Sequence, residues 1–204
     1  RQGEAVVGPV CTDENGLATF TNVPLGTYLV VEASTPPGYI PADPFEVTVG
    51  NNETVSLTID NPRGNVGVRV YKLDCQTDPG EVSAADLFAD PTYAPDGCVR
   101  VPGVAFDVTI DGEPLPNQFV TGADGSFAIS VQVFSSISVT EDLSTATPGY
   151  LPREATISID NVPADGIDGL VFVNLAQDGH LKLIKYVCKT EKPKATEFEI
   201  SDPT

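Results

Sequence analysis

The sequence predicts an all-β protein made of tandem immunoglobulin-like β-sandwich modules. Eighteen Gly and eighteen Pro divide the 204 residues into short segments, and the apolar residues between them are mostly Val, Ile, Leu, Phe and Tyr, which suit half-buried strands. A repeat with a period of about 110 residues indicates two modules, which the length also favours. The sequence shows no convincing helix.

Three segments recur along the chain. YLVVEASTPPGYIP (28–41) returns as ISVTEDLSTATPGYLP (137–152), TDENGLATF (12–20) as TGADGSFAI (121–129), and GVRVYKLDC (67–75) as HLKLIKYVC (180–188). The paired segments carry the same turn signals before their apolar residues. Asn61 and Asn174 precede the next matching lysine by the same distance, since 72 − 61 = 11 and 185 − 174 = 11.

The repeat is out of frame with the chain. We expect residues 64–176 to form a complete sandwich, residues 1–63 to form a sandwich without its first strand, and residues 177–204 to carry the spare first strand. An open sheet edge needs a partner. One interpretation is donation of this strand to the next copy, a head-to-tail contact that propagates as a filament. The other is that the chain is one period excised from a longer tandem array.

Strand alternation directs one polar trio of each repeat toward the apolar face. Lys72 shares a face with Val68 and Val70. Glu141 follows Ile137 and Val139 in the same way, and Asn174 follows Leu170 and Phe172; the second trio is Lys185, Glu32 and Asn61. An unpaired buried charge is costly, so two matched inward trios need an explanation.

Burial suggests a chemical role for the trio. Desolvation lowers the pKa of a lysine and raises that of a glutamate, which favours a neutral amine beside a neutral acid. A neutral amine is a nucleophile, and a protonated carboxyl can polarise the asparagine carboxamide while ammonia leaves. The product is an amide that joins the first strand to the last. The alternative is a buried lysine and glutamate ion pair with the asparagine hydrogen-bonded beside it.

The motifs resemble a known family. VYKLD, GTYLVVEASTPPGYIP and TIDNP, with second copies IKYVC, ISVTEDLSTATPGYLP and FVNLA, resemble the collagen-adhesin B-type module. This is the CnaB-type or SpaA-like, prealbumin-like fold of Gram-positive pilin backbones and adhesin stalks. The resemblance implies an autocatalytic isopeptide bond between Lys72 and Asn174 with Glu141 as catalyst. For the split copy it implies a bond between Lys185 and Asn61 with Glu32.

Cysteine placement favours disulfides over a metal site. No CxxC pair accompanies the single histidine, so we expect no metal and no cofactor. Cys75 and Cys188 occupy equivalent positions; Cys98 can pair with Cys75 inside the complete module, which leaves Cys188 for Cys11 across the join. Free thiols are the alternative. Disulfides indicate an extracellular location, and the loop at 76–97 is expected to be a surface loop held by Cys75 and Cys98.

Charge narrows the choice of function. A net charge of −18, from 11 basic and 29 acidic residues, disfavours nucleic-acid binding, and no apolar run approaches the roughly 20 residues that span a bilayer. We expect a secreted or cell-surface structural subunit whose partners are copies of itself, with no enzymatic activity beyond its own cross-linking. The alternative is an adhesin that binds a host protein or a glycan, and an aromatic content of 7% without Trp gives it little support.

Overall fold

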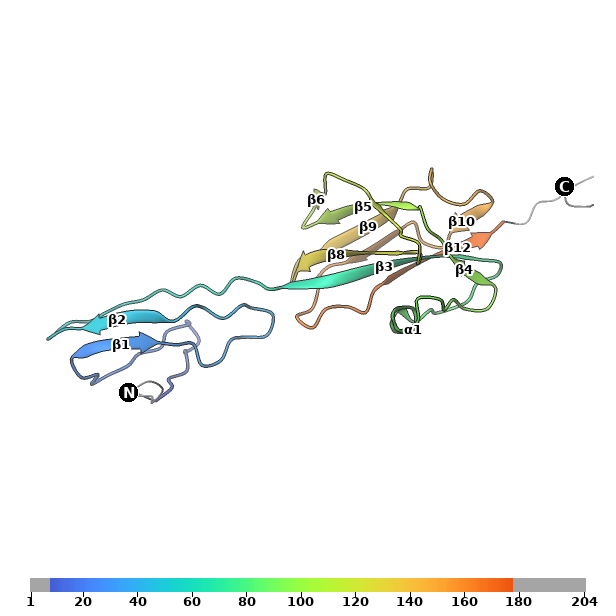
Figure 1. Cartoon of the computed structure of the whole chain (residues 1–204). Coiled ribbons are helices and arrows are strands. Elements are labelled where there is room, and N and C mark those ends of the chain that lie inside the picture. Colours follow the sequence, from blue (N-terminus) through green and yellow to red (C-terminus); the bar gives the residue numbers. More distant parts are fainter. Residues whose placement is uncertain (1–7, 178–204) are drawn as a thin grey trace, which may run out of the picture.

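The computed structural model describes residues 8–177, in which two groups of strands follow one another along the chain (Figure 1). The first group is β1 (Gly26–Val30) and β2 (Phe45–Val49). The second group is β3 (Asn65–Cys75), β4 (Cys98–Arg100), β5 (Ala105–Ile110), β6 (Glu113–Pro114), β7 (Phe119–Val120), β8 (Ser126–Gln132), β9 (Ile137–Glu141), β10 (Tyr150–Pro152), β11 (Thr156–Ile159) and β12 (Leu170–Ala176). The predicted all-β fold class is confirmed.

The second group forms a sandwich of two sheets. One sheet has the order β10-β12-β3-β4, with β8 also pairing with β3, and the other has the order β11-β9-β5-β6, with β7 pairing with β5. β12 runs parallel to β3, while the other pairs of this sandwich are antiparallel. The first and last strands of the module are therefore neighbours in one sheet.

The core lies between these two sheets. Val68 and Val70 of β3 are fully buried there, together with Phe106 of β5 and Phe172 of β12, whose rings meet edge to face with 4.9 Å between centroids. Edge-to-face packing suits the quadrupoles of two aromatic rings. The alternation of β3 thus directs the residue that follows this apolar row, Lys72, into the same space.

β3 is buried on its other face as well, by the insert at 76–97. The insert contains a helix that the sequence did not predict, α1 (Ala84–Ala89), which begins after Ser83 as its N-cap. Leu87 of this helix is buried in a second apolar cluster with Tyr71 and Leu73 of β3. Six residues are too few for a recognisable helical period, so the insert was expected to be a surface loop only.

The first group is much less complete. Among residues 8–63 the regular strands are β1 and β2 alone. In the second module β8 and β12 both pair with β3, whereas the segments that match them in the first module, 17–23 and 57–63, form no strand and contain only an isolated bridge at Arg63. The row of Val55, Leu57 and Ile59 is 39–47% exposed. The segments left unpaired are therefore those that a first strand would bind.

A turn of the first module contacts the second module. Gly64 N–H donates to the Gly38 carbonyl at 2.7 Å, and the Tyr39 ring lies 5.7 Å from that of Phe134. A Cβ on Gly38 would lie 2.9 Å from Phe134 Cζ and 3.0 Å from Ala164 Cβ. The contact therefore leaves no space for a side chain at position 38.

The same turn recurs at the far end of the second module. Gln177 N–H donates to the Gly149 carbonyl at 2.8 Å, and Tyr150 pairs with Ala176 as Tyr39 pairs with Arg63. Gly149 also has the same φ of 85° as Gly38. Both copies of the repeat thus end in one backbone arrangement.

This equivalence gives a matched test of the contact. Gly38→Ala and Gly149→Ala both place a Cβ at positive φ, at a cost of about 1–2 kcal/mol. Only Gly38→Ala also overlaps Phe134 and Ala164, because no other described atom lies within 4 Å of a Cβ at Gly149. We expect Gly38→Ala alone to accelerate limited trypsin cleavage after Arg63, which donates to the Val133 carbonyl across the contact. Equal cleavage rates in the two variants would contradict this account.

Candidate functional site

Three strands bring the predicted trio of the complete module together. Lys72 lies on β3 and Asn174 on the adjacent β12, and Glu141 ends β9 in the opposite sheet. Lys72 and Asn174 are fully buried and Glu141 is 3% exposed. The trio therefore occupies the space between the sheets, at the end of the apolar core.

Glu141 contacts both of the other groups. Asn174 Nδ2 donates to Glu141 Oε1 at 2.8 Å, and Lys72 Nζ lies 3.8 Å from the same oxygen. The carboxyl group is thus held between the amine and the carboxamide. This is the position from which an acid could act on the carboxamide while the amine approaches it.

Two buried acceptors of this cluster lack a donor, Glu141 Oε2 and Asn174 Oδ1. Burial raises the pKa of Glu141, against the opposing effect of Lys72 and of the Asn174 hydrogen bond. A buried acceptor without a donor is costly, and a proton on Oε2 would remove the uncompensated charge of the carboxylate. The surroundings of Glu141 therefore favour its neutral form.

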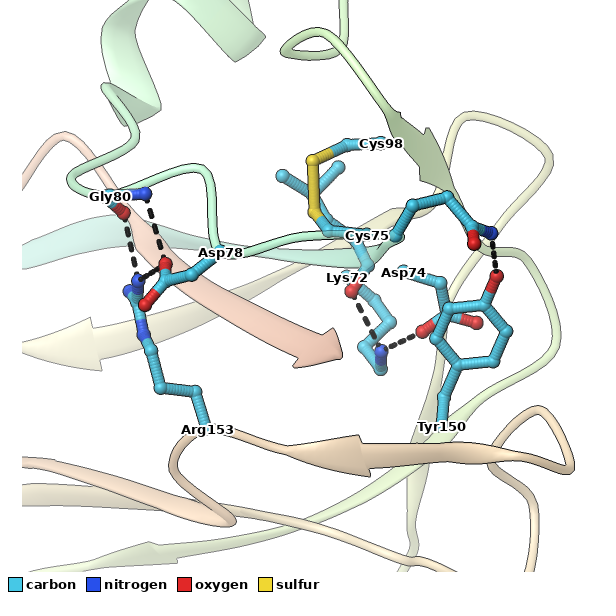
Figure 2. The surroundings of a disulfide bond; sticks show 10 residues. Lys72, Asp74, Cys75, Asp78, Gly80, Cys98, Tyr150 and Arg153 are labelled. Carbon is cyan, nitrogen blue, oxygen red and sulfur yellow. Dashed lines mark hydrogen bonds and ion pairs between the residues drawn. A yellow bond between two sulfur atoms is a disulfide. The ribbon is translucent and has the colours of Figure 1, made fainter. Parts of the chain in front are cut away.

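Asp74 is a fourth member of the site that the sequence analysis missed. It is 3% exposed, and Lys72 Nζ donates to its Oδ1 at 2.5 Å and to the Leu73 carbonyl at 3.0 Å (Figure 2). Lys72 is therefore ion-paired with Asp74, whereas the sequence analysis expected a neutral amine beside Glu141. Strand alternation places Asp74 on the same face as Lys72. The residue at the equivalent position of the other copy is Val187, so comparison of the two copies gives no sign that an acidic residue is needed there.

Two residues of the second trio also meet. Asn61 Nδ2 lies 2.8 Å from each oxygen of Glu32, and Ala42 N–H donates to Glu32 at 3.0 Å. The Ala42 backbone bond, followed by the Asn61 bond, lowers the pKa of Glu32. Lys185, the third member, lies outside the described residues. The two glutamates therefore bond to equivalent asparagines but have pKa values shifted in opposite directions.

A disulfide joins Cys75 to Cys98 next to Lys72 (Figure 2). This disulfide links the two ends of the insert at 76–97, and the register of β3 and β4 places the two cysteines opposite each other. Arg153 holds the insert from the β10 side by donating to Asp78 Oδ1 at 3.1 Å and to the Gly80 carbonyl at 2.8 Å.

Only one cysteine of the second predicted disulfide lies within the described residues. Cys11 is exposed, and its predicted partner Cys188 lies outside the described residues. Within residues 8–177, no group of three His, Cys, Asp or Glu side chains is arranged to hold a metal ion. Over the same residues, no helix has both the length and the apolar character that crossing a membrane requires.

Comparison with known proteins identifies the first module. Residues 1–63 match the family described as SpaA, prealbumin-like fold domain. This match covers less than a third of the chain, and over those residues the chain is similar to a SpaA-like domain. A comparison with curated proteins found no match.

Solved structures with similar chains include two pilins. The TIE protein of Bacillus anthracis is 20% identical to this chain, with a TM-score of 0.47. The match covers 82% of this chain and 28% of the TIE chain. GBS52, a minor pilin of Streptococcus agalactiae, is 14% identical with a TM-score of 0.41, and the match covers 86% of this chain and 71% of GBS52. The shaft pilin SpaA of Lactobacillus rhamnosus GG is 13% identical with a TM-score of 0.32, and the match covers 86% of this chain and 70% of the pilin. This chain thus spans little more than a quarter of the length of the TIE protein.

Removing the disulfide should destabilise the complete module. For Cys75→Ser with Cys98→Ser, we expect the free energy of unfolding to fall by about 3 kcal/mol, because the closed loop no longer restricts the unfolded chain. Urea denaturation followed by circular dichroism measures this change. Cys11→Ser is the control and should leave the unfolding of the complete module unchanged; equal effects of the two changes would contradict the assignment.

Proposed function

We propose that the chain is a structural subunit of an extracellular or cell-surface filament, pilus or stalk, and that an isopeptide bond between Lys72 and Asn174 locks its complete module. The observation that carries this proposal is the buried cluster of Lys72, Glu141 and Asn174 between the two sheets. Because these side chains are at most 3% exposed, an external substrate has no access to them. Their available reaction partners are one another.

The proposed reaction needs no cofactor. The Lys72 amine, once it has lost one proton, attacks Cγ of Asn174 and forms a new carbon–nitrogen bond, while Glu141 gives its proton to Oδ1. The bond from Cγ to Nδ2 then breaks, Nδ2 leaves as ammonia with the second lysine proton, and Glu141 recovers its own proton as the carbonyl reforms. The product is an amide between β3 and β12, and the protein loses about 17 Da.

The position of the bond suits a load-bearing role. The chain enters the complete module at β3 and leaves it from β12, and these two strands are parallel neighbours. A force along the chain would otherwise be resisted only by the hydrogen bonds between them. An amide between Lys72 and Asn174 would carry that force through covalent bonds, so the module could not be pulled open from its ends.

We further propose that the first module is completed by the 177–204 segment of the next copy, head to tail. The unpaired segments of the first module and the exposed Val55, Leu57 and Ile59 support this, because residues 180–188 match the strand that fills this place in the second module. Lys185 would bond to Asn61 with Glu32 as catalyst, and Cys188 would pair with Cys11. The turn shared by Gly38 and Gly149 supports an end-on contact between copies.

Intact mass spectrometry tests the internal bond. We expect the native chain to weigh about 17 Da less than its sequence for each bond formed. Glu141→Gln should abolish the loss at Asn174, because an amide cannot provide the proton. Glu113→Gln, which changes an exposed glutamate of β6, is the matched control and should keep the loss. An unmodified mass for the native chain would contradict the cross-link.

Denaturing electrophoresis under reducing conditions tests the assembly. Cross-linked copies should persist as a ladder, and Lys185→Ala should collapse the ladder to monomers because the amine is removed. Lys182→Ala is the matched control, since alternation in the proposed donated strand would put residue 182 on the opposite face from residue 185. A single monomer band from the native chain would contradict strand donation and favour a repeat excised from a longer tandem-array adhesin.

A further inference from the structure

We infer that Asp74 is a catalytic residue of the cross-link, the base that takes the first proton from the Lys72 amine. The inference rests on the proposed function, because it concerns the same bond between Lys72 and Asn174. It starts from the carboxylate that is hydrogen-bonded to the reacting nitrogen, with 2.5 Å between Lys72 Nζ and Asp74 Oδ1.

The hydrogen-bond partners of Lys72 leave Asp74 as the base within reach. Nζ donates to the Leu73 carbonyl and to Asp74, and a peptide carbonyl is far too weak a base to take the proton. Glu141 Oε1 is 3.8 Å away from Nζ, beyond hydrogen-bond distance, and it already accepts from Asn174. Among the described residues, Asp74 alone is both a hydrogen-bond partner of Nζ and able to take its proton.

The charges of the cluster support a division of work between its two carboxyl groups. Lys72 and Asp74 together are neutral as an ion pair, and a protonated Glu141 adds no charge. With both carboxyl groups ionised, the buried cluster would carry one net negative charge, which desolvation makes costly. Asp74 is thus suited to be the base and Glu141 the acid.

The step balances without a further reactant. A proton moves from the Lys72 ammonium to the Asp74 carboxylate, which leaves a neutral amine and a neutral acid. The amine attacks Cγ of Asn174, and Glu141 passes the second lysine proton to the departing Nδ2. The products are the amide, ammonia and a protonated Asp74, which returns to its ionised form when ammonia or solvent takes the proton.

This route predicts a specific pH dependence. The ionisable groups that meet here are Lys72 and Asp74 from β3 and Glu141 from β9, and β12 contributes Asn174, which does not titrate in this range. While Asp74 keeps the first proton inside the site, the rate should be nearly independent of pH between about 6 and 8. Without Asp74 that proton must leave to solvent first, so the rate should rise about tenfold per pH unit.

Refolding kinetics measure this directly. Denatured, uncross-linked chain would be diluted into buffer at several pH values, quenched in acid denaturant at intervals and weighed for the loss of about 17 Da. We expect Asp74→Asn, which keeps the shape but accepts no proton, to slow the loss about 100-fold at pH 6 and to make it pH-dependent. Asp107→Asn on β5 is the matched control, because Asp107 is exposed, and it should match the native chain. Asp74→Glu should restore a flat profile.

The outcomes separate the inference from the function on which it rests. No mass loss in the native chain contradicts the cross-link itself. A native chain that cross-links while Asp74→Asn does so within twofold of its rate and with the same profile overturns the role of Asp74. If Asp74→Asn does not fold, as judged by a missing Cys75–Cys98 disulfide, the native profile decides: a tenfold rise per pH unit overturns the inference and a flat profile supports it.

Discussion

The parallel pairing of β3 with β12 is the constraint on which the rest of this structure depends. It places the strand that enters the complete module beside the strand that leaves it, and it aligns Asn174 with Asp74, two residues from Lys72. Parallel neighbours must be far apart in the sequence, and here they are the first and last strands of the module, so their pairing requires the two ends of the module to meet. A reaction that depends on their contact therefore requires this long-range pairing.

The two glutamates bond to equivalent asparagines in different surroundings. Glu141 is buried between the two sheets of the second module, and this burial raises its pKa. Glu32 bonds to the equivalent asparagine but also accepts a backbone hydrogen bond from Ala42, which lowers its pKa. The same residue type is therefore favoured as a neutral acid in the complete module and as a carboxylate in the open one.

Strand alternation and the internal repeat were enough to predict which side chains of the complete module meet. Lys72, Glu141 and Asn174 each follow an apolar row, and a period of two needs no knowledge of the fold. Asp74 follows the same alternation, yet its repeat partner is Val187, so only the contact with Nζ reveals it. The helix α1 is stabilised by packing of Leu87 on β3, a distant contact that a six-residue sequence pattern does not encode. Alternation likewise groups Val55, Leu57 and Ile59 into one apolar row, but it does not reveal that all three are exposed.

The central claim is that β3 and β12 are joined by a covalent bond, and tryptic peptide mapping of the reduced native protein tests it most directly. An amide on Lys72 blocks cleavage after that residue, so residues 70–100 should be recovered as one peptide that is branched at Lys72 and joined through Asn174 to residues 154–182. Fragmentation of this branched peptide would place the bond. Recovery of residues 73–100 and 154–182 as separate, unmodified peptides would contradict the account.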